Sequence, residues 1–316
     1  MEKEGFIKYL QSKDFSVKMI SECVRVTELF LKRTAKEEVQ VTKPDVLKYL
    51  EYLKDKGLEN ITRQHYLCAV NHYFTFLSED EKIAQNPCLF LKIRGTNKKR
   101  LYKIYTPEEL EQLYDAYYQL FVRNFEEKHY KYEKQQQYAI LSRERNALIV
   151  SILTNQGITT AEIDKLEISD VDLTKATIKI RGGRTLNNRT LPLKASQIGL
   201  IINYLQKTRP QLFEEQKIES EKLFLLLPAT RKKKVYSGSL EDIFWGLTKQ
   251  IKTIDKQFIN FKQVRASMIT FWLKTQGLRK AQYFAGHRYI SSTERYVNNN
   301  LDGLIDDINK LNPFDF

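Results

Sequence analysis

Most of this chain carries its apolar side chains at helical spacing, and only one short stretch alternates as β-strands do. Residues 17–34 place their apolar side chains along one approximately helical face. Other segments begin with residues that typically cap helices. Thr106, for example, is followed by Pro107 and Glu109. The strand-like stretch, residues 177–193, consists of two segments around a Gly-Gly turn. The pattern predicts a mainly α-helical fold with a small antiparallel β-sheet.

A change of composition divides the chain. Residues 1–91 read as four or so short helices, enough for a small α-helical domain. Residues 92–104 contain six basic residues and no acidic one, and they show no regular spacing, which is typical of an interdomain linker. Residues 105–316 return to helical spacing, so we expect a second and larger domain there.

The chain has 52 Lys and Arg residues against 39 Asp and Glu, a formal net charge of +13. Such a charge favours a polyanionic partner, because each phosphate that a cation neutralises releases a bound counterion. We therefore expect nucleic acid, with phosphate contacts from two basic clusters and a groove contact from Arg63, early in a helix of the first domain. The clusters are Lys98, Lys99 and Arg100 in the linker, and Arg231, Lys232 and Lys233 in a loop.

Several classes of protein are excluded. Three cysteines, none of them in a Cys-x-x-Cys pair, make neither a disulfide framework nor a cysteine metal site. The chain has no run of about 18 apolar residues and no signal-peptide segment at its start. It also lacks a phosphate-binding loop motif and an acidic metal cluster. We expect a soluble cytoplasmic protein with no membrane partner, no metal and no cofactor.

Four residues near the C-terminus form a chemically suggestive series. Lys262 and Arg265 lie three positions apart, on one side of a predicted helix, and His287 and Tyr296 follow. A phenol can attack phosphorus while cations hold the nonbridging oxygens and a protonated group serves the leaving oxygen. The series therefore favours phosphoryl transfer at a phosphodiester.

These residues resemble the tyrosine recombinase, or phage integrase, family. In that family an arginine of a His-x-x-Arg box is followed by a Leu-Gly-His box and then by the nucleophilic tyrosine. Val264-Arg265, Phe284-Ala-Gly-His287 and the segment ending at Tyr296 keep this spacing. The resemblance covers essentially the whole chain and implies a two-domain architecture, a helical core-binding domain followed by a catalytic domain. It implies that Tyr296 is the nucleophile, that Arg265 grips the scissile phosphate bidentately and that His287 hydrogen-bonds it.

Three positions depart from the family pattern. Thr159 stands where the family has its first catalytic arginine, although Glu162 and other neighbours match. Arg184 falls on the family's hairpin lysine, and Lys262 replaces the histidine of the His-x-x-Arg box. Removing one transition-state donor costs roughly 3–4 kcal/mol, so either another cation replaces the guanidinium or activity is weak or absent. Arg184 or Arg181 is the predicted replacement, because a guanidinium reaches far and can bind two oxygens.

The resemblance implies an enzyme that cuts and rejoins double-stranded DNA through a 3′-phosphotyrosine, without ATP or metal, as a recombinase of a phage, a transposon or the chromosome. The alternatives are a DNA-binding protein of the same fold that has lost catalysis, and a type IB topoisomerase. The implied setting is the nucleoid, with accessory directionality factors among the partners.

The segment after Tyr296 carries an amphipathic stripe. In the family such a tail often docks on a neighbouring protomer within a tetramer; packing on its own domain is the alternative. The stripe consists of Leu301, Leu304, Ile305, Ile308 and Leu311.

Overall fold

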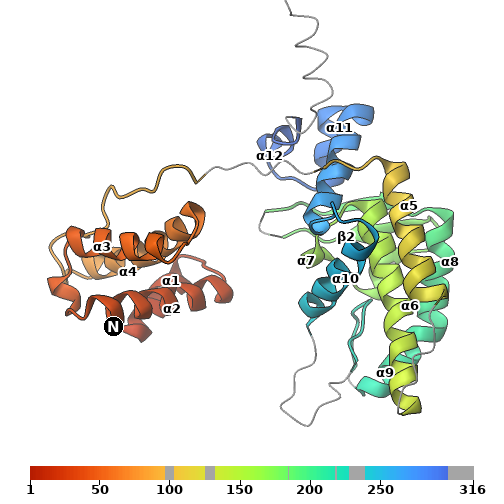
Figure 1. The fold of residues 1–316 in the computed structure, drawn as a ribbon, viewed down its shortest axis with the longest axis horizontal. Coiled ribbons are helices and arrows are strands. Elements are labelled where there is room, and N and C mark those ends of the chain that lie inside the picture. Colours follow the sequence, from red (N-terminus) through yellow and green to blue (C-terminus); the bar gives the residue numbers. More distant parts are fainter. Residues whose placement is uncertain (97–102, 125–131, 184, 218, 228–238, 298–316) are drawn as a thin grey trace, which may run out of the picture. The chain divides into compact units, whose positions relative to one another are not determined.

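The computed structural model describes residues 1–96, 103–124, 132–183, 185–217, 219–227 and 239–297. The chain forms two compact units, Met1–Arg100 and Leu101–Phe316, and the division between them falls within the basic stretch 92–104. Both units are mainly helical (Figure 1).

The described part of the first unit, residues 1–96, has four helices around an aromatic core. Its largest buried side chains, Phe6, Phe30, Tyr73 and Phe74, come from three of the helices and meet largely edge to face. Such ring pairs stabilise a core beyond the area that they bury. The helices are α1 (Lys3–Ser12), α2 (Val17–Thr34), α3 (Lys43–Asp55) and α4 (Asn60–Glu79), with a short 3₁₀ turn, η1 (Glu38–Gln40), before α3.

The two ends of the basic stretch are held by different units. Asn60 of α4 donates a hydrogen bond to the Arg94 carbonyl at 2.9 Å, so the start of the stretch packs on the first unit. The Tyr105 N–H donates to Ser267 Oγ at 2.9 Å, which ties the far end to the second unit. The cluster Lys98, Lys99 and Arg100 lies outside the described residues, and the linker bounds 92–104 stay a prediction.

The second unit packs around the C-terminal half of α6 (Glu133–Gln156), whose Leu148, Ile149, Ile152 and Leu153 are each at most 1% exposed. The other elements before the sheet are α5 (Pro107–Tyr118), η2 (Gln119–Arg123), α7 (Thr160–Ile163) and η3 (Ile168–Asp170). After the sheet come α8 (Ala195–Asn203), η4 (Tyr204–Thr208), α9 (Arg209–Gln216), α10 (Leu240–Ile254), α11 (Phe261–Ala285) and α12 (Ile290–Glu294).

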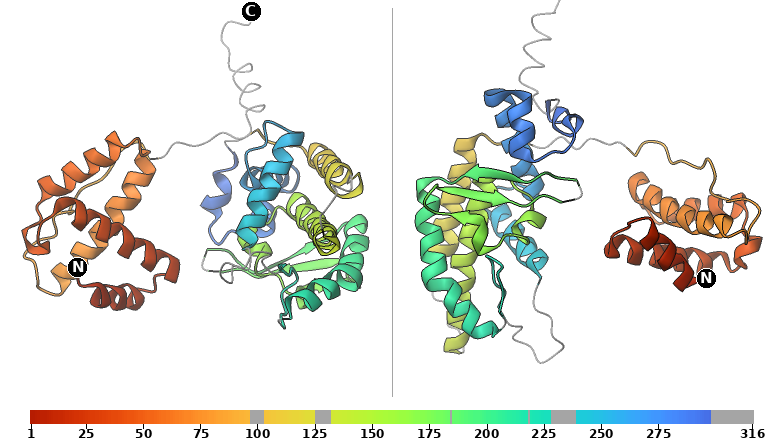
Figure 2. Two further views of the ribbon diagram at one scale, coloured as in Figure 1. Left: turned by 60° about the horizontal axis from the view of Figure 1, so that its bottom comes forward. Right: turned by 180° about the vertical axis from the view of Figure 1, so that it is seen from behind.

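Three short antiparallel strands lie in the order β1 (Val171–Asp172), β2 (Thr177–Ile180) and β3 (Arg189–Pro192). Figure 2 shows them running from α8 towards the C-terminal helices α11 and α12. The β2–β3 connection reaches those helices, because the Asn187 N–H donates to the Gly286 carbonyl at 2.7 Å. The sheet therefore brings residues of the middle of the chain to the C-terminal segment.

The predicted fold class, mainly α with a small antiparallel sheet, is confirmed. Thr106 caps α5 in a reciprocal box with Glu109, as its spacing predicts. Gly277, at φ 77°, separates two helical pieces within α11. The sequence analysis did not predict α9, whose apolar residues are too few to set a clear period.

Candidate active site

Arg265 is a buried guanidinium fixed by two backbone carbonyls. From α11 it donates to the Gly157 carbonyl at 2.9 Å and to the Ala285 carbonyl at 2.6 Å. Burial lowers its pKa, which the nearby Glu162 carboxylate opposes. Gly157, in the left-handed region at φ 55°, must be glycine, because a Cβ there would lie 2.7 Å from Met268 Cβ. The C-terminal ends of α6 and α11 thus hold this cation in one orientation.

His287 follows the left-handed Gly286 that ends α11. Its Nε2 lies 3.4 Å from Arg265 Nη2, and its Nδ1 lies 2.9 Å from Oγ1 of the buried Thr293. A guanidinium has no lone pair to offer, so Nε2 accepts and Nδ1–H donates to Thr293. Burial, then the charges of Arg265 and Arg189, lower the pKa of His287 to about 4. The imidazole is therefore neutral near pH 7.

This low pKa predicts a pH-dependent stability. The unfolded chain takes up a proton at His287 near its ordinary pKa of 6.5, whereas the folded chain does so only near 4. The free energy of unfolding should therefore fall as pH drops from 6.5 to 4, by at most about 1.4 kcal/mol per pH unit from this group. Urea unfolding at several pH values should show a shallower fall for His287→Gln. Identical pH dependence of the two proteins would contradict the assignment.

Tyr296 lies against His287 in the same unit. The two rings are stacked, with centroids 5.8 Å apart and planes 19° from parallel. The Tyr296 ring is half-buried and comes just after α12, whose Thr293 orients the imidazole. The structure thus brings together Arg265, His287 and Tyr296, three groups whose chemistry suits phosphoryl transfer at a diester.

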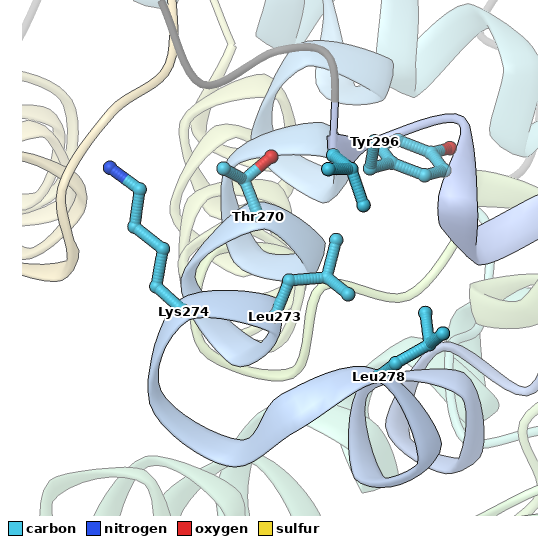
Figure 3. Close-up of a pocket in the computed structure, with 6 residues that line it drawn as sticks. Thr270, Leu273, Lys274, Leu278 and Tyr296 are labelled. Carbon is cyan, nitrogen blue, oxygen red and sulfur yellow. The ribbon is translucent and has the colours of Figure 1, made fainter. Parts of the chain in front are cut away.

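A pocket of about 340 Å³ opens beside Tyr296 (Figure 3). Its walls are mostly apolar and come from α11 and the segment after α12. They are Thr270, Leu273, Lys274, Leu278, Tyr296 and Val297.

Comparison with known proteins places the chain in a family. Residues 128–302 match the family model described as "Phage integrase family". The chain belongs to this family. The tyrosine recombinase XerC of Natranaerobius thermophilus is 27% identical over 278 residues, covering 87% of this chain and 84% of that protein.

Solved integrase structures share the fold. XerH bound to a palindromic difH substrate, a post-cleavage complex, aligns with a TM-score of 0.63 at 18% identity, covering 90% of this chain and 78% of XerH. A lambda integrase tetramer bound to a Holliday junction aligns with a TM-score of 0.57 at 14% identity, covering 91% and 76%. At these identities the likeness shows the fold alone, the two-domain tyrosine recombinase architecture.

Thr159, which the sequence resemblance aligns with the first arginine of the integrase pattern, is the N-cap of α7. Its Oγ1 accepts a hydrogen bond from the Glu162 N–H at 3.2 Å, and the Glu162 carboxylate accepts one from the Thr159 N–H at 2.8 Å. This reciprocal box is a common way to satisfy the first N–H groups of a helix. Thr159 therefore shapes the backbone and contributes no charge.

Sequence reasoning missed a cation in this integrase site, Arg189 of β3. Its side chain is fully buried, and its Nη1 lies 2.6 Å from Glu162 Oε1. The other oxygen of the same carboxylate, Oε2, lies 3.8 Å from Arg265 Nη1. Burial acts to raise the pKa of Glu162. The hydrogen bond and charge of Arg189, the hydrogen bond from the Thr159 N–H and the charge of Arg265 outweigh it, so the pKa is lowered overall. The missed signal was strand alternation, since Arg189 shares the inward face of β3 with Leu191.

The other predicted site residues lie in different surroundings. Arg181 is paired with Glu167 and Asp170, and its Nε lies 2.9 Å from Asp170 Oδ1. Arg63 donates hydrogen bonds within the first unit, to the Leu50 carbonyl at 3.3 Å and to Asn60 Oδ1 at 2.8 Å.

Lys262 is exposed in the first turn of α11, one turn before Arg265. Arg184 and the cluster Arg231, Lys232 and Lys233 lie outside the described residues. Phosphate or DNA contacts by these groups stay predictions.

Within the described ranges, no set of three or more His, Cys, Asp and Glu side chains is arranged to hold a metal ion. None of the helices described is both long and apolar enough to cross a membrane.

Proposed function

We propose that this chain is a tyrosine-type site-specific DNA recombinase that cuts and rejoins DNA through a 3′-phosphotyrosine at Tyr296. One observation carries the proposal: the Tyr296 ring stacks on His287, which contacts the buried Arg265, all within one unit. Membership of the phage integrase family and similarity to the recombinase XerC support it.

The proposed reaction exchanges one phosphodiester for another. The Tyr296 oxygen attacks phosphorus, the bond to the 5′ oxygen breaks, and a free 5′-hydroxyl leaves with a proton. Attack by the 5′-hydroxyl of a partner strand reverses the step and releases Tyr296. Since the bond energy is kept in the tyrosyl ester, the chain's own groups suffice for both steps.

Each residue has a proposed role in that exchange. Arg265 donates to the nonbridging oxygens, and its two backbone contacts keep it oriented before DNA arrives. His287 hydrogen-bonds the same phosphate. Lys262, exposed one turn away, and Arg184, at the position of the family's hairpin lysine, are the candidates to protonate or stabilise the leaving oxygen.

The decisive experiment uses a nicked suicide duplex, from which the short cleaved strand diffuses away so that the covalent complex accumulates. Its sequence is selected from random DNA by binding to the protein. A protein–DNA adduct that survives a denaturing gel is expected. Binding without any adduct would favour the DNA-binding alternative, which the family comparisons do not favour, and relaxation of plasmid lacking the site would favour a topoisomerase.

We further propose that the protein assembles as a tetramer on DNA through the tail stripe, residues 301–311, which lies outside the described residues. The lambda integrase tetramer on a Holliday junction, which shares the fold, supports such an assembly. A chain ending at Val297 should bind single sites normally and fail to form the four-protomer complex in native gels. Action at the nucleoid and accessory directionality factors belong to the same proposal.

The basic stretch should make DNA binding strongly salt-dependent. Lys98, Lys99 and Arg100 add three cations, and each phosphate contact steepens the slope of log K against log[salt] by about 0.9. Changing all three to Ala should flatten that slope by up to about 2.7 and weaken binding to all sequences alike. Fluorescence anisotropy across a salt series measures this.

A matched control removes three lysines that are already paired with carboxylates, Lys3, Lys13 and Lys82. That triple variant should leave the slope nearly unchanged. If the linker variant also keeps the wild-type slope, the basic stretch does not contact phosphate.

A further inference from the structure

We propose that Arg189 supplies the second guanidinium at the scissile phosphate, in place of the arginine that is absent at Thr159. The inference rests on the proposed recombinase function and adds a residue to its site. Arg189 reaches the site from β3 and pairs with Glu162 Oε1, whereas the Thr159 N–H at the start of α7 donates to Glu162 Oε2.

The first support is the carboxylate between the two arginines. Glu162 Oε1 pairs with Arg189 at 2.6 Å, while Oε2 lies 3.8 Å from Arg265. One buried negative charge thus faces two buried positive charges, and His287 beside them is neutral near pH 7. The cluster keeps one net positive charge, which a singly charged phosphodiester would balance. Without Arg189 the carboxylate would cancel Arg265, and nothing in this buried cluster would attract the phosphate.

The second support is that Arg189 has donors to spare. Only Nη1 bonds Glu162, and Nε and Nη2 are buried without any hydrogen-bond partner. Buried donors are nearly always satisfied, so an orphaned pair in a native structure calls for an acceptor that arrives from outside. The Nε–H and an Nη2–H lie along one edge of the planar guanidinium, and such a pair can bind two oxygens of a phosphate.

The third support is the contact with Gly286. A Cβ at this position would lie 2.5 Å from Arg189 Nη1, so only glycine leaves room for the guanidinium next to His287. The Gly286 carbonyl also accepts the Asn187 N–H from the β2–β3 connection. Arg189 is therefore packed against the backbone that carries His287, and its side chain has no exposed surface without DNA. Phosphate contact requires this backbone to shift.

Arg181 is less suited to the role. Glu167 and Asp170 already neutralise its charge, and neither carboxylate belongs to the cluster around Arg265.

The test compares cleavage of two selected duplexes that differ only at the scissile position, one with the natural phosphate and one with a neutral methylphosphonate. The position of the cut is first determined with the wild-type protein. Arg189→Gln should cut the phosphate duplex on the order of 10²-fold more slowly, as for loss of a transition-state donor. It should cut the methylphosphonate within tenfold of wild type, because a neutral group needs less positive charge. A merely structural role would slow both substrates equally.

Two further variants complete the test. Arg189→Lys keeps the charge beside Glu162 and therefore the fold, but lacks the planar pair of N–H groups that can bind two phosphate oxygens at once. Phosphate cleavage should therefore fall about tenfold or more, with methylphosphonate cleavage retained. Arg145→Gln removes another buried arginine, one that donates to the Leu225 carbonyl, and should leave the ratio of the two rates unchanged.

The outcomes separate the inference from the proposed function. Equal losses on both duplexes for Arg189→Gln, or wild-type phosphate cleavage by Arg189→Lys, would overturn the role of Arg189 alone. If wild type itself cuts neither duplex, the recombinase function falls and this inference falls with it.

Discussion

Tyr296→Phe is expected to abolish covalent attachment to DNA and to leave duplex affinity within a few-fold of wild type. Phe keeps the ring that stacks on His287 and removes only the oxygen that attacks phosphorus. The neighbouring Arg265 is held by the Gly157 and Ala285 carbonyls, which the substitution does not touch. The suicide duplex measures adduct formation, and anisotropy measures affinity separately.

Tyr289→Phe is the matched control for this substitution. Tyr289 is also a C-terminal tyrosine close to His287 in sequence, but its side chain is 67% exposed. This control should form the adduct at the wild-type rate. An adduct that persists in Tyr296→Phe and disappears in Tyr289→Phe would move the nucleophile to residue 289.

Glu162→Leu is expected to destabilise the second unit by about 3–5 kcal/mol, because it leaves the charges of Arg189 and Arg265 buried without their carboxylate. Removal of the side chain also deprives the Thr159 N–H of its acceptor. Both tryptophans of the chain, Trp245 and Trp272, lie in the second unit, so their fluorescence during urea unfolding reports on that unit.

Glu111→Leu provides the control for loss of an ion pair. Glu111 and Lys194 pair at 3.4 Å on the surface, with half or more of each side chain exposed, and such pairs contribute roughly 0–1 kcal/mol. The urea unfolding midpoint of Glu111→Leu should stay close to that of wild type. Equal midpoints for the two variants would mean that Glu162 is not the buried countercharge of the site.

Sequence patterns identified much of the fold because helix starts depend on near neighbours. Thr106 and Ser239 each bond the backbone three positions ahead, and such caps can be read from a few letters. The order of Arg265, His287 and Tyr296 is also local, since α11, Gly286 and α12 follow one another directly. Resemblance to the integrase family then indicated what these residues do.

The partners of the buried charges were decided only by the tertiary structure. Arg189 and Glu162 are 27 positions apart, and Arg265 reaches a carbonyl 108 positions before it. Whether Arg189 faces the core or the solvent depends on the register of a four-residue strand, which sequence alone leaves weakly specified. The sequence by itself determined most of the helices, several of their caps and the order of the reactive groups. Packing of the sheet against the C-terminal segment determined which cation stands beside them, because a buried charge must find its partner in space and not along the chain.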